Sequence, residues 1–385
     1  MIKHYKPIFR RSRFSRFGLL IMLSCMAGYV QAQLSGSYTI DATKTTSGTN
    51  YASWSAFASA IGTSGVNGAV RVTVMTDETT ANVVTFNAIT GASSTNTITI
   101  DGNAKRLLSS STNEAILFNG ADYVTMSNLT IQKTGTGTAQ TGIRFTNASD
   151  YNTLNGLTIE FTAQTSSSTA GGAYIAFASS PTSLTTTTTS QNGSFNTIRN
   201  CMMRTTNSGA PGPTFGIVDQ QSTSFYTSTA NNNTFEGNTI RNFFFYAIYN
   251  RYTNGEQFIN NDISRLAASS SSPCNTTLYG IWTYYTYGTN RSTSYRGNNF
   301  HDMPYAGASA SSTSNYINTY YTLFGWYLYG SATNPVIFDG NTTRNVVAYS
   351  QFFHAYLYYA YAINFQNNVV DKNQSYTTSA RSEEH

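Results

Sequence analysis

Two aspartates and a histidine are the residues of this 385-residue chain whose types suggest acid–base chemistry. Asp262 lies in one copy of a sequence repeat, and His301 and Asp302 lie in the next. A carboxylate and an imidazole within hydrogen-bonding reach can act as general base and general acid. Arg241 and Arg344, from the same surface, are candidates for the base of a lyase. In so polar a chain such groups also meet by chance, so catalysis is the alternative here and not the main prediction.

A second candidate is a broken basic stripe. One outward position of the repeat carries, in separate copies, Arg204, Arg241, His301 and Arg344. Copies stacked as parallel strands lie about 4.8 Å apart, and Arg matches the geometry of carboxylate and sulfate. The stripe could therefore hold an acidic polysaccharide. The alternative is a solvated surface on which the arginines pair with Asp262, Asp302 or Asp339.

Aromatic residues fill another outward column, on a different strand of the repeat. After Arg144 and Val218 the column continues with Tyr249, Trp282, Phe324 and Phe353, and two residues further on, on the same face, stand Tyr284 and Trp326. Stacked rings on a flat β surface can contact the apolar faces of sugars. They can equally support one another and the loops between strands. Glycan contact and structural stacking are therefore the two interpretations.

These columns depend on a repeat that is clearest in Asn233 to Asn242. Eight copies align on a final anchor, apolar in seven of them, which recurs at intervals of 23 to 44 residues: Ile131, Ile159, Met203, Ile240, Ile263, Phe300, Thr343 and Val370. Another core-forming residue stands five positions earlier, and only Gly or Asn occurs three positions earlier. Gly and Asn enter the left-handed backbone region at low cost. Each copy therefore predicts a strand, a bend and a second strand, and the period predicts a solenoid.

Asparagines follow the bend in five successive copies, at an inward position: Asn238, Asn261, Asn298, Asn341 and Asn368. Amides stacked at strand spacing form a hydrogen-bonded ladder, so we predict a structural role for all five. On this basis Asn298→Leu lowers thermal stability. Cys201 takes the same position one copy earlier. We predict a buried free thiol there, without a disulfide to Cys274 and without a metal cluster.

The predicted fold is all-β, a right-handed parallel β-helix over residues 70–370. Residues 33–69 are predicted to form an N-terminal cap. In it Asn50 caps an amphipathic helix that carries on one face Trp54, Phe57, Ala58 and Ile61. Such a helix would shield the unpaired β edge of the first coil. Where two anchors are far apart, we predict a coil that carries an inserted loop. Residues 371–385 are predicted to form a polar C-terminal tail.

In these repeats the chain resembles the pectin-lyase-like right-handed parallel β-helices, with their Asn-Thr-Ile-x-Gly-Asn-x-Ile pattern. The likeness covers about Val70 to Val370 and is carried by Asn196 to Met203, Asn233 to Ile240 and Phe338 to Thr343. The opening part, with Tyr38-Thr39-Ile40 and Gly91 to Ile98, is similar to the start of exported β-helix proteins of Bacteroidota-type bacteria.

The resemblance implies the fold more firmly than an activity, because this family includes lyases, hydrolases, adhesins and inert surface proteins. Its pectate-lyase branch would imply a calcium site of clustered Asp residues with an Arg base. Its polygalacturonase branch would imply Asn-Thr-Asp, Asp-Asp and Gly-His-Gly motifs. The sequence contains none of these motifs.

Residues 1–32 are typical of a secretory signal peptide. Six basic residues precede an apolar run from Phe17 to Val30, which is shorter than the roughly 20 residues of a membrane span. Small residues predict cleavage after Ala32, and a lipoprotein signal at Cys25 is the less favoured alternative. Cleavage removes six of the 22 Lys+Arg and none of the 17 Asp+Glu, which leaves a net charge near −1. Nucleic-acid binding thereby loses its compositional argument.

These features predict an exported, single-domain protein, secreted or held at the cell surface, that binds carbohydrate without cleaving it. The alternatives are a polysaccharide lyase or glycosidase, and an adhesive or purely structural surface protein. The predicted partner is a polysaccharide or cell-surface glycan, with no transmembrane segment in the mature chain. No cofactor is predicted, because calcium is compatible with the fold but has no support in the sequence. The sequence leaves the oligomeric state open.

Overall fold

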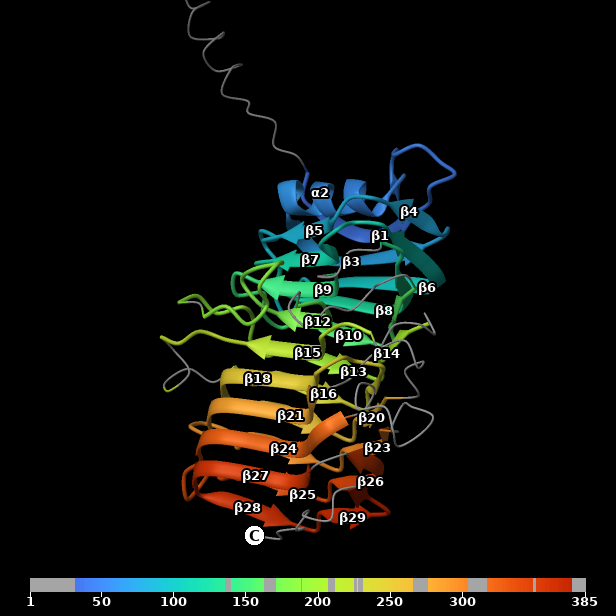
Figure 1. The fold of residues 1–385 in the computed structure, drawn as a ribbon. Helices are drawn as coiled ribbons and strands as arrows, with labels where there is room; N and C mark the ends of the chain where they lie inside the picture. The colour runs from blue at the N-terminus through green and yellow to red at the C-terminus, as the bar shows by residue number, and fades with distance from the viewer. Residues whose placement is uncertain are drawn as a thin grey trace, which may run out of the picture.

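The chain folds as a right-handed parallel β-helix with a helix at its N-terminal end, as predicted (Figure 1). The computed structural model describes residues 32–135, 140–162, 171–187, 189–206, 212–224, 227, 231–265, 276–303, 317–348 and 351–375. Within these residues the coils build one sheet of 21 strands, here called the first sheet, and one of nine, the second sheet. The predicted signal peptide, apart from Ala32, lies outside the described residues, as do Cys274 and most of the predicted tail.

The second sheet has one strand from each coil, in chain order from β5 to β27. Its strands are β5 (Val84–Asn87), β7 (Glu114–Asn119), β9 (Thr141–Thr146), β12 (Ala173–Phe177), β15 (Phe215–Gln220), β18 (Tyr246–Asn254), β21 (Thr276–Tyr287), β24 (Ile317–Tyr329) and β27 (Gln351–Tyr361).

The first sheet begins with longer strands and then divides each coil into two arms. The opening strands are β1 (Leu34–Ile40), β2 (Asn50–Tyr51), β3 (Val66–Val74), β4 (Glu78–Thr80), β6 (Ile98–Ser109) and β8 (Val124–Lys133). The arms before the bend are β10 (Thr153–Asn155), β13 (Thr197–Arg199), β16 (Thr234–Glu236), β19 (Gln257–Ile259), β22 (Ser294–Arg296), β25 (Val336–Asp339) and β28 (Ile363–Gln366). The arms after the bend are β11 (Thr158–Phe161), β14 (Met202–Thr205), β17 (Thr239–Arg241), β20 (Asp262–Ser264), β23 (Asn299–Met303), β26 (Thr342–Ala348) and β29 (Val369–Asp371), followed by β30 (Gln374–Ser375).

The helix α2 (Trp54–Ser64) lies across the N-terminal end of the solenoid (Figure 1). The four predicted apolar residues are buried, and Phe57 packs edge-on against Phe86 of β5 at 6.3 Å between ring centroids. The N-cap is Ser53, whose side chain accepts a hydrogen bond from the Ala56 amide, so the prediction of Asn50 as the cap was wrong. Asn50 belongs instead to the short strand β2, which pairs with β1.

The bends follow the predicted pattern in every copy of the repeat. The eight Gly or Asn residues at this position have φ between 51° and 66°: Asn128, Gly156, Asn200, Gly237, Asn260, Gly297, Gly340 and Asn367. All eight anchors pair with one another in consecutive coils, from Ile131 to Val370. The left-handed position turns the chain between the two arms, and this is why only residue types that tolerate it occur there.

The five asparagines after the bend form a continuous ladder. The amide nitrogens of the first four donate to the side-chain oxygen of the next asparagine at 2.9–3.0 Å, and all five donate to a backbone carbonyl of the preceding coil at 2.9–3.0 Å. The same side-chain oxygens accept the backbone amide of the preceding coil at 3.0–3.1 Å. Buried amides with both donor and acceptor satisfied stabilise a single arrangement of the coils.

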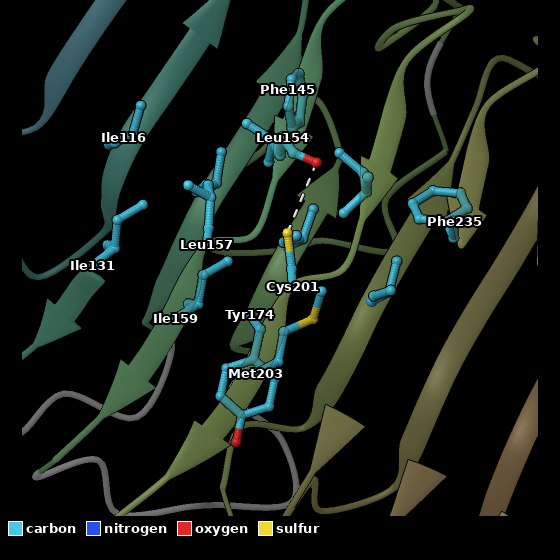
Figure 2. Close-up of a cluster of buried hydrophobic side chains, with 14 of the residues drawn as sticks. Ile116, Ile131, Phe145, Leu154, Leu157, Ile159, Tyr174, Cys201, Met203 and Phe235 are labelled. Atoms are coloured by element: carbon cyan, nitrogen blue, oxygen red, sulfur yellow. Dashed lines mark hydrogen bonds between the residues drawn. The ribbon is translucent and has the colours of Figure 1, made fainter. Parts of the chain in front are cut away.

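Cys201 ends this ladder on the N-terminal side, within an apolar part of the core (Figure 2). Its thiol is free and buried, and lies 3.8 Å from the carbonyl oxygen of Leu154. Burial raises the pKa of the Cys201 thiol to about 11, so it stays protonated at neutral pH.

Candidate functional site

The acid–base candidates Asp262, His301 and Asp302 meet on the outer surface of the first sheet. Nε2 of His301 on β23 is 2.9 Å from Oδ1 of Asp262 on β20, in the preceding coil. Nδ1 of His301 is 2.7 Å from Oδ2 of Asp302, the next residue. The amide of Asn299 donates to Asp262 at 2.9 Å, and that of Asn345 donates to Asp302 at 3.0 Å. The two amides therefore hold the carboxylates in place around the ring.

An imidazole between two carboxylates makes both hydrogen bonds only when each ring nitrogen carries a proton. Hydrogen bonds from His301 and Asn345 lower the pKa of Asp302, and the charges of His301 and Arg344 act in the same direction. The His301 side chain is 14% exposed, against 39% for Asp262 and 43% for Asp302. Both ring nitrogens of His301 are engaged by carboxylates of the protein itself. The arrangement is that of an ion-pair network.

The basic stripe is interrupted. Nη2 of Arg204 lies 3.2 Å from Oε2 of Glu160, so this arginine pairs with a residue other than the three aspartates predicted for the stripe. Arg241 is half-buried, and its Nε has no hydrogen-bond partner. Arg344 is exposed and lies in register with His301. The stripe thus offers an exposed guanidinium beside the His301 network, and not a continuous row of cations.

Aromatic side chains cover the outer surface of the last four strands of the second sheet. The register aligns Tyr249 with Trp282 and Phe324, and it aligns Tyr284 with Trp326, as the sequence predicts. We call this surface the aromatic face and define it by Tyr246, Tyr249, Tyr279, Trp282, Tyr284, Tyr321, Phe324, Trp326, Phe353, Tyr356 and Tyr358.

Phe353 belongs to a different column from the predicted one. It pairs with Tyr321 and stacks on that ring at 4.8 Å, whereas Tyr356 is the residue that pairs with Phe324. The predicted register of β27 was therefore wrong by three residues. The strand carries aromatic residues at so many positions that a slip of three still places an aromatic ring outward, so the sequence alone does not specify the pairing.

Tyr249 points outward but is covered, with 6% of its surface exposed. It belongs to a small apolar cluster outside the sheet, together with Phe215, Val218 and Leu184. Leu184 comes from the segment after β12, and β12 itself was not recognised in the sequence because its outward residues are small alanines. Tyr249 therefore does not face solvent, because the rings of Phe215, Tyr246 and Trp282 pack around it.

Ring orientation decides what the aromatic face can contact. Tyr249, Trp282, Phe324 and Tyr356 stack with interplanar angles of 4–11°, so each ring covers its neighbour and turns an edge outward. Trp326 differs, because its ring is inclined by 61° to Phe324 and by 79° to Tyr284. It is also 37% exposed, although its strand is flanked by strands on both sides. Trp326 is therefore more exposed than Tyr249, Trp282 and Phe324, whereas Tyr356, on the last strand, is 42% exposed.

The aromatic face carries almost no charge. Strands β21, β24 and β27 contain no Asp, Glu, Lys or Arg. At one edge the guanidinium of Arg251 on β18 packs 4.7 Å from the ring centre of Tyr252 and 5.2 Å from that of Tyr284. Burial raises the pKa of Tyr284 to about 12, so its hydroxyl is neutral in ordinary conditions. A ligand of this face would meet rings and hydroxyls.

In the part of the chain that the structure describes, no group of three or more His, Cys, Asp or Glu side chains is placed to hold a metal ion. No helix among the described residues is long and apolar enough to cross a membrane.

No family model matches the chain, and no curated protein matches its sequence. Among solved structures it is similar to a GH136 lacto-N-biosidase from Eubacterium ramulus (11% identity, TM-score 0.40, 88% of this chain and 67% of that one). It is also similar to an alginate lyase from Paenibacillus sp. (13%, 0.40, 81% and 96%) and to the Streptococcus pneumoniae surface protein and adhesin PfbA (10%, 0.39, 84% and 94%). Likenesses this distant carry no activity to this chain, and the pectin-lyase-like resemblance stays a prediction.

Proposed function

We propose that this protein is an exported β-helix protein that binds uncharged polysaccharide on its aromatic face without cleaving it. The observation that carries the proposal is Trp326, which is 37% exposed on an inner strand and whose ring is inclined by 61° to that of Phe324. A sugar ring has an apolar face of C–H groups that packs on an exposed aromatic surface and hydroxyls that bond to polar neighbours. The surrounding tyrosines can supply those polar contacts.

The geometry of the coils favours a polymer over a single sugar. Tyr284, Trp326 and Tyr358 stand in register on three consecutive strands. Parallel strands lie about 4.8 Å apart, so a chain laid along the solenoid axis would meet an aromatic residue at each coil. The absence of ionised side chains on β21, β24 and β27 favours a neutral polymer, because an acidic one would lose hydration without gaining a partner charge.

Substitution of Trp326 by Ala tests this proposal. We expect retention on a neutral polysaccharide to weaken by about tenfold or more, which is the scale of a binding hot spot, and to change little with salt. The matched control is Phe195→Ala, because Phe195 is 44% exposed in an aromatic stack with Tyr151 at a corner of another coil. The proposal fails if the Trp326 variant binds as the wild type does, or if both variants lose binding equally.

Export is a part of this proposal that rests on residues 1–32. We expect protein recovered from the medium or the cell surface to begin at Gln33 on N-terminal sequencing. Uncleaved protein confined to the cell interior would contradict export without bearing on the aromatic face.

A second candidate function is the cleavage of an acidic polysaccharide, and it is favoured by the meeting of Asp262, His301 and Asp302 beside the exposed Arg344. In a lyase, Arg344 or Arg241 would be the base. Incubation with polyuronates followed by detection of unsaturated products tests this reading, and His301→Ala should then abolish product formation. If the protein neither binds nor cleaves glycans but self-associates or attaches to cells, an adhesive or structural role is left.

A further inference from the structure

One inward column of the second sheet changes from apolar to polar at β15, although the core around it stays apolar. In the second sheet one inward column runs through four phenylalanines in register, Phe86, Phe118, Phe145 and Phe177. The column then continues with Asp219, Asn250 and Thr283, all of them buried. A carboxylate in the middle of a solenoid is costly unless it is paired, so this position requires a partner.

A second asparagine ladder ends beside this column. At the corner before the first sheet, the side chains of Asn152, Asn196 and Asn233 each accept the backbone amide of the preceding coil at 2.9–3.0 Å. Backbone pairing places Glu256 at the same corner of the next coil. Glu256 does not continue the ladder, because both its carboxylate oxygens are buried without a hydrogen-bond partner. Asn233 turns its amide to Asp219 instead, at 3.3 Å.

Two buried carboxylates and a buried amide lie around this corner, on Asp219, Glu256 and Asn250. Asn250 stands next to Asp219 in the column, its amide nitrogen donates to the Tyr295 hydroxyl at 2.8 Å, and its Oδ1 has no hydrogen-bond partner. Asn233 connects the two carboxylates, because its side chain donates to Asp219 at 3.3 Å and its backbone carbonyl accepts from Gln257, the residue after Glu256. The charge of Asp219 acts on Glu256 and that of Glu256 acts on Tyr295, in agreement with this placement.

The protein's own cations do not neutralise the two carboxylates. Arg291 is close enough for its charge to act on Glu256, but its guanidinium donates to Thr234 at 3.2 Å and forms no ion pair with Glu256. Burial raises the pKa of Asp219 to about 7, and burial together with the charge of Asp219 raises that of Glu256 well above its usual range. Asp219 accepts hydrogen bonds from Gln221 and Asn233, whereas neither Glu256 oxygen has a donor at full hydrogen-bonding geometry, and the nearby Thr253 side chain and Glu256 backbone do not offset the effect of burial.

We propose that Asp219, Glu256 and Asn250 form an internal binding site for a calcium ion inside the solenoid. The available ligands are all oxygens, two carboxylates and an amide carbonyl, which is the set that hard cations prefer and that calcium accepts in flexible geometry. The ion would supply the charge that the unpartnered Glu256 lacks. It would join β15 and β18 at the inner side of the coils where the aromatic face begins. This site is separate from the surface proposed to bind glycan.

Metal content and thermal stability of the full chain test the site. We expect about one calcium ion per chain by elemental analysis after dialysis against calcium. We also expect a Tm higher in calcium than in EDTA, by roughly 3 °C or more at a hundredfold excess over Kd. Terbium is an independent probe, because excitation of the adjacent Tyr295 should sensitise its luminescence. Glu256→Gln and Asp219→Asn should each abolish the calcium-dependent rise in Tm and the terbium signal.

The control variant is Asp150→Asn, which changes another partly buried carboxylate, bonded to the Ser194 amide two coils earlier, and should retain calcium binding. If the Glu256 and Asp219 variants do not fold, the wild-type measurements alone decide. Wild-type protein that holds no calcium or terbium and melts equally in calcium and EDTA overturns the proposal, and would show that the two carboxyls keep their protons. Loss of binding in Asp150→Asn as well would place the ion elsewhere.

Discussion

Replacing Asn298 by leucine probes the ladder at its middle rung. The Asn298 amide donates to the Phe258 carbonyl at 2.9 Å and to Oδ1 of Asn341 at 3.0 Å. Its own Oδ1 accepts the backbone N–H of Asn261 at 3.1 Å and the side-chain amide of Asn261 at 2.9 Å. Leucine has a similar size but makes none of these four bonds, and the site is fully buried, so water cannot replace them.

The expected loss follows from the groups left without partners. Two buried donors of Asn261 lose their acceptor, at roughly 1–3 kcal/mol each. Burial of the apolar leucine side chain stabilises the folded state by about 1.5–3 kcal/mol, which offsets part of this loss. The net destabilisation is therefore about 2 kcal/mol, which should lower Tm by several degrees.

Thermal melts followed by circular dichroism measure this loss. The matched control is Asn299→Leu, one residue further on, where the side chain is half-buried and bonds to Asp262 and Thr342 at the surface. We expect the control to cost less than about 1 kcal/mol. If Asn298→Leu melts with the wild type, or no lower than the control, the ladder contributes nothing measurable and the reasoning is refuted.

Three further predictions concern the bend, the end of the ladder and a buried histidine. Gly340 has φ of 65°, and the nearest atom to a Cβ added there is the Gly297 nitrogen at 4.0 Å, so a side chain would meet no clash. Gly340→Ala should therefore cost about 1–2 kcal/mol of unfolding free energy from backbone strain alone, and Gly340→Asn less. Equal losses of the two variants in denaturant titrations would contradict this. Cys201→Asn should extend the ladder to Asn238 and raise stability by about 1 kcal/mol, whereas a lower Tm would show that the site has no room. Burial lowers the pKa of His354 from 6.5 to about 4, so the unfolded chain binds this proton first and stability should fall as pH drops from 6.5 to about 4. A profile of Tm against pH that is unchanged in His354→Asn would rule this out.

The repeat was legible in the sequence because one coil imposes the same local demands each time. A left-handed bend admits Gly237 or Asn260 and little else, and a strand with one buried face requires Phe235 and Ile240 to be apolar. The inward asparagines from Asn238 onward could be predicted for the same reason, since an amide repeated at one position in successive coils finds a donor and an acceptor in the next amide. These are properties of short segments, so the fold class and the ladder follow from them.

The register of the aromatic strands could not be predicted in the same way. Gln351–Tyr361 carries rings at outward and inward positions alike, so the alternation that marks a face is absent, and the pairing of Tyr356 with Phe324 depends on the preceding coil. Burial of Tyr249 depends on rings of other strands, Phe215 and Trp282, which only the pairing of the coils brings to it.

The amino-acid sequence by itself therefore determined the rod: the bends, the core positions and the asparagine ladder, because each is set by backbone and packing demands within a single coil. Only the tertiary structure decided which side chains are exposed or grouped so that they could bind a ligand or take part in catalysis. Stacking of coils inclined Trp326 to Phe324, closed His301 between Asp262 and Asp302, and placed Glu256 next to Asn233, which bonds to Asp219. These relations join residues of different strands and coils, and their geometry is fixed when the coils pack against one another.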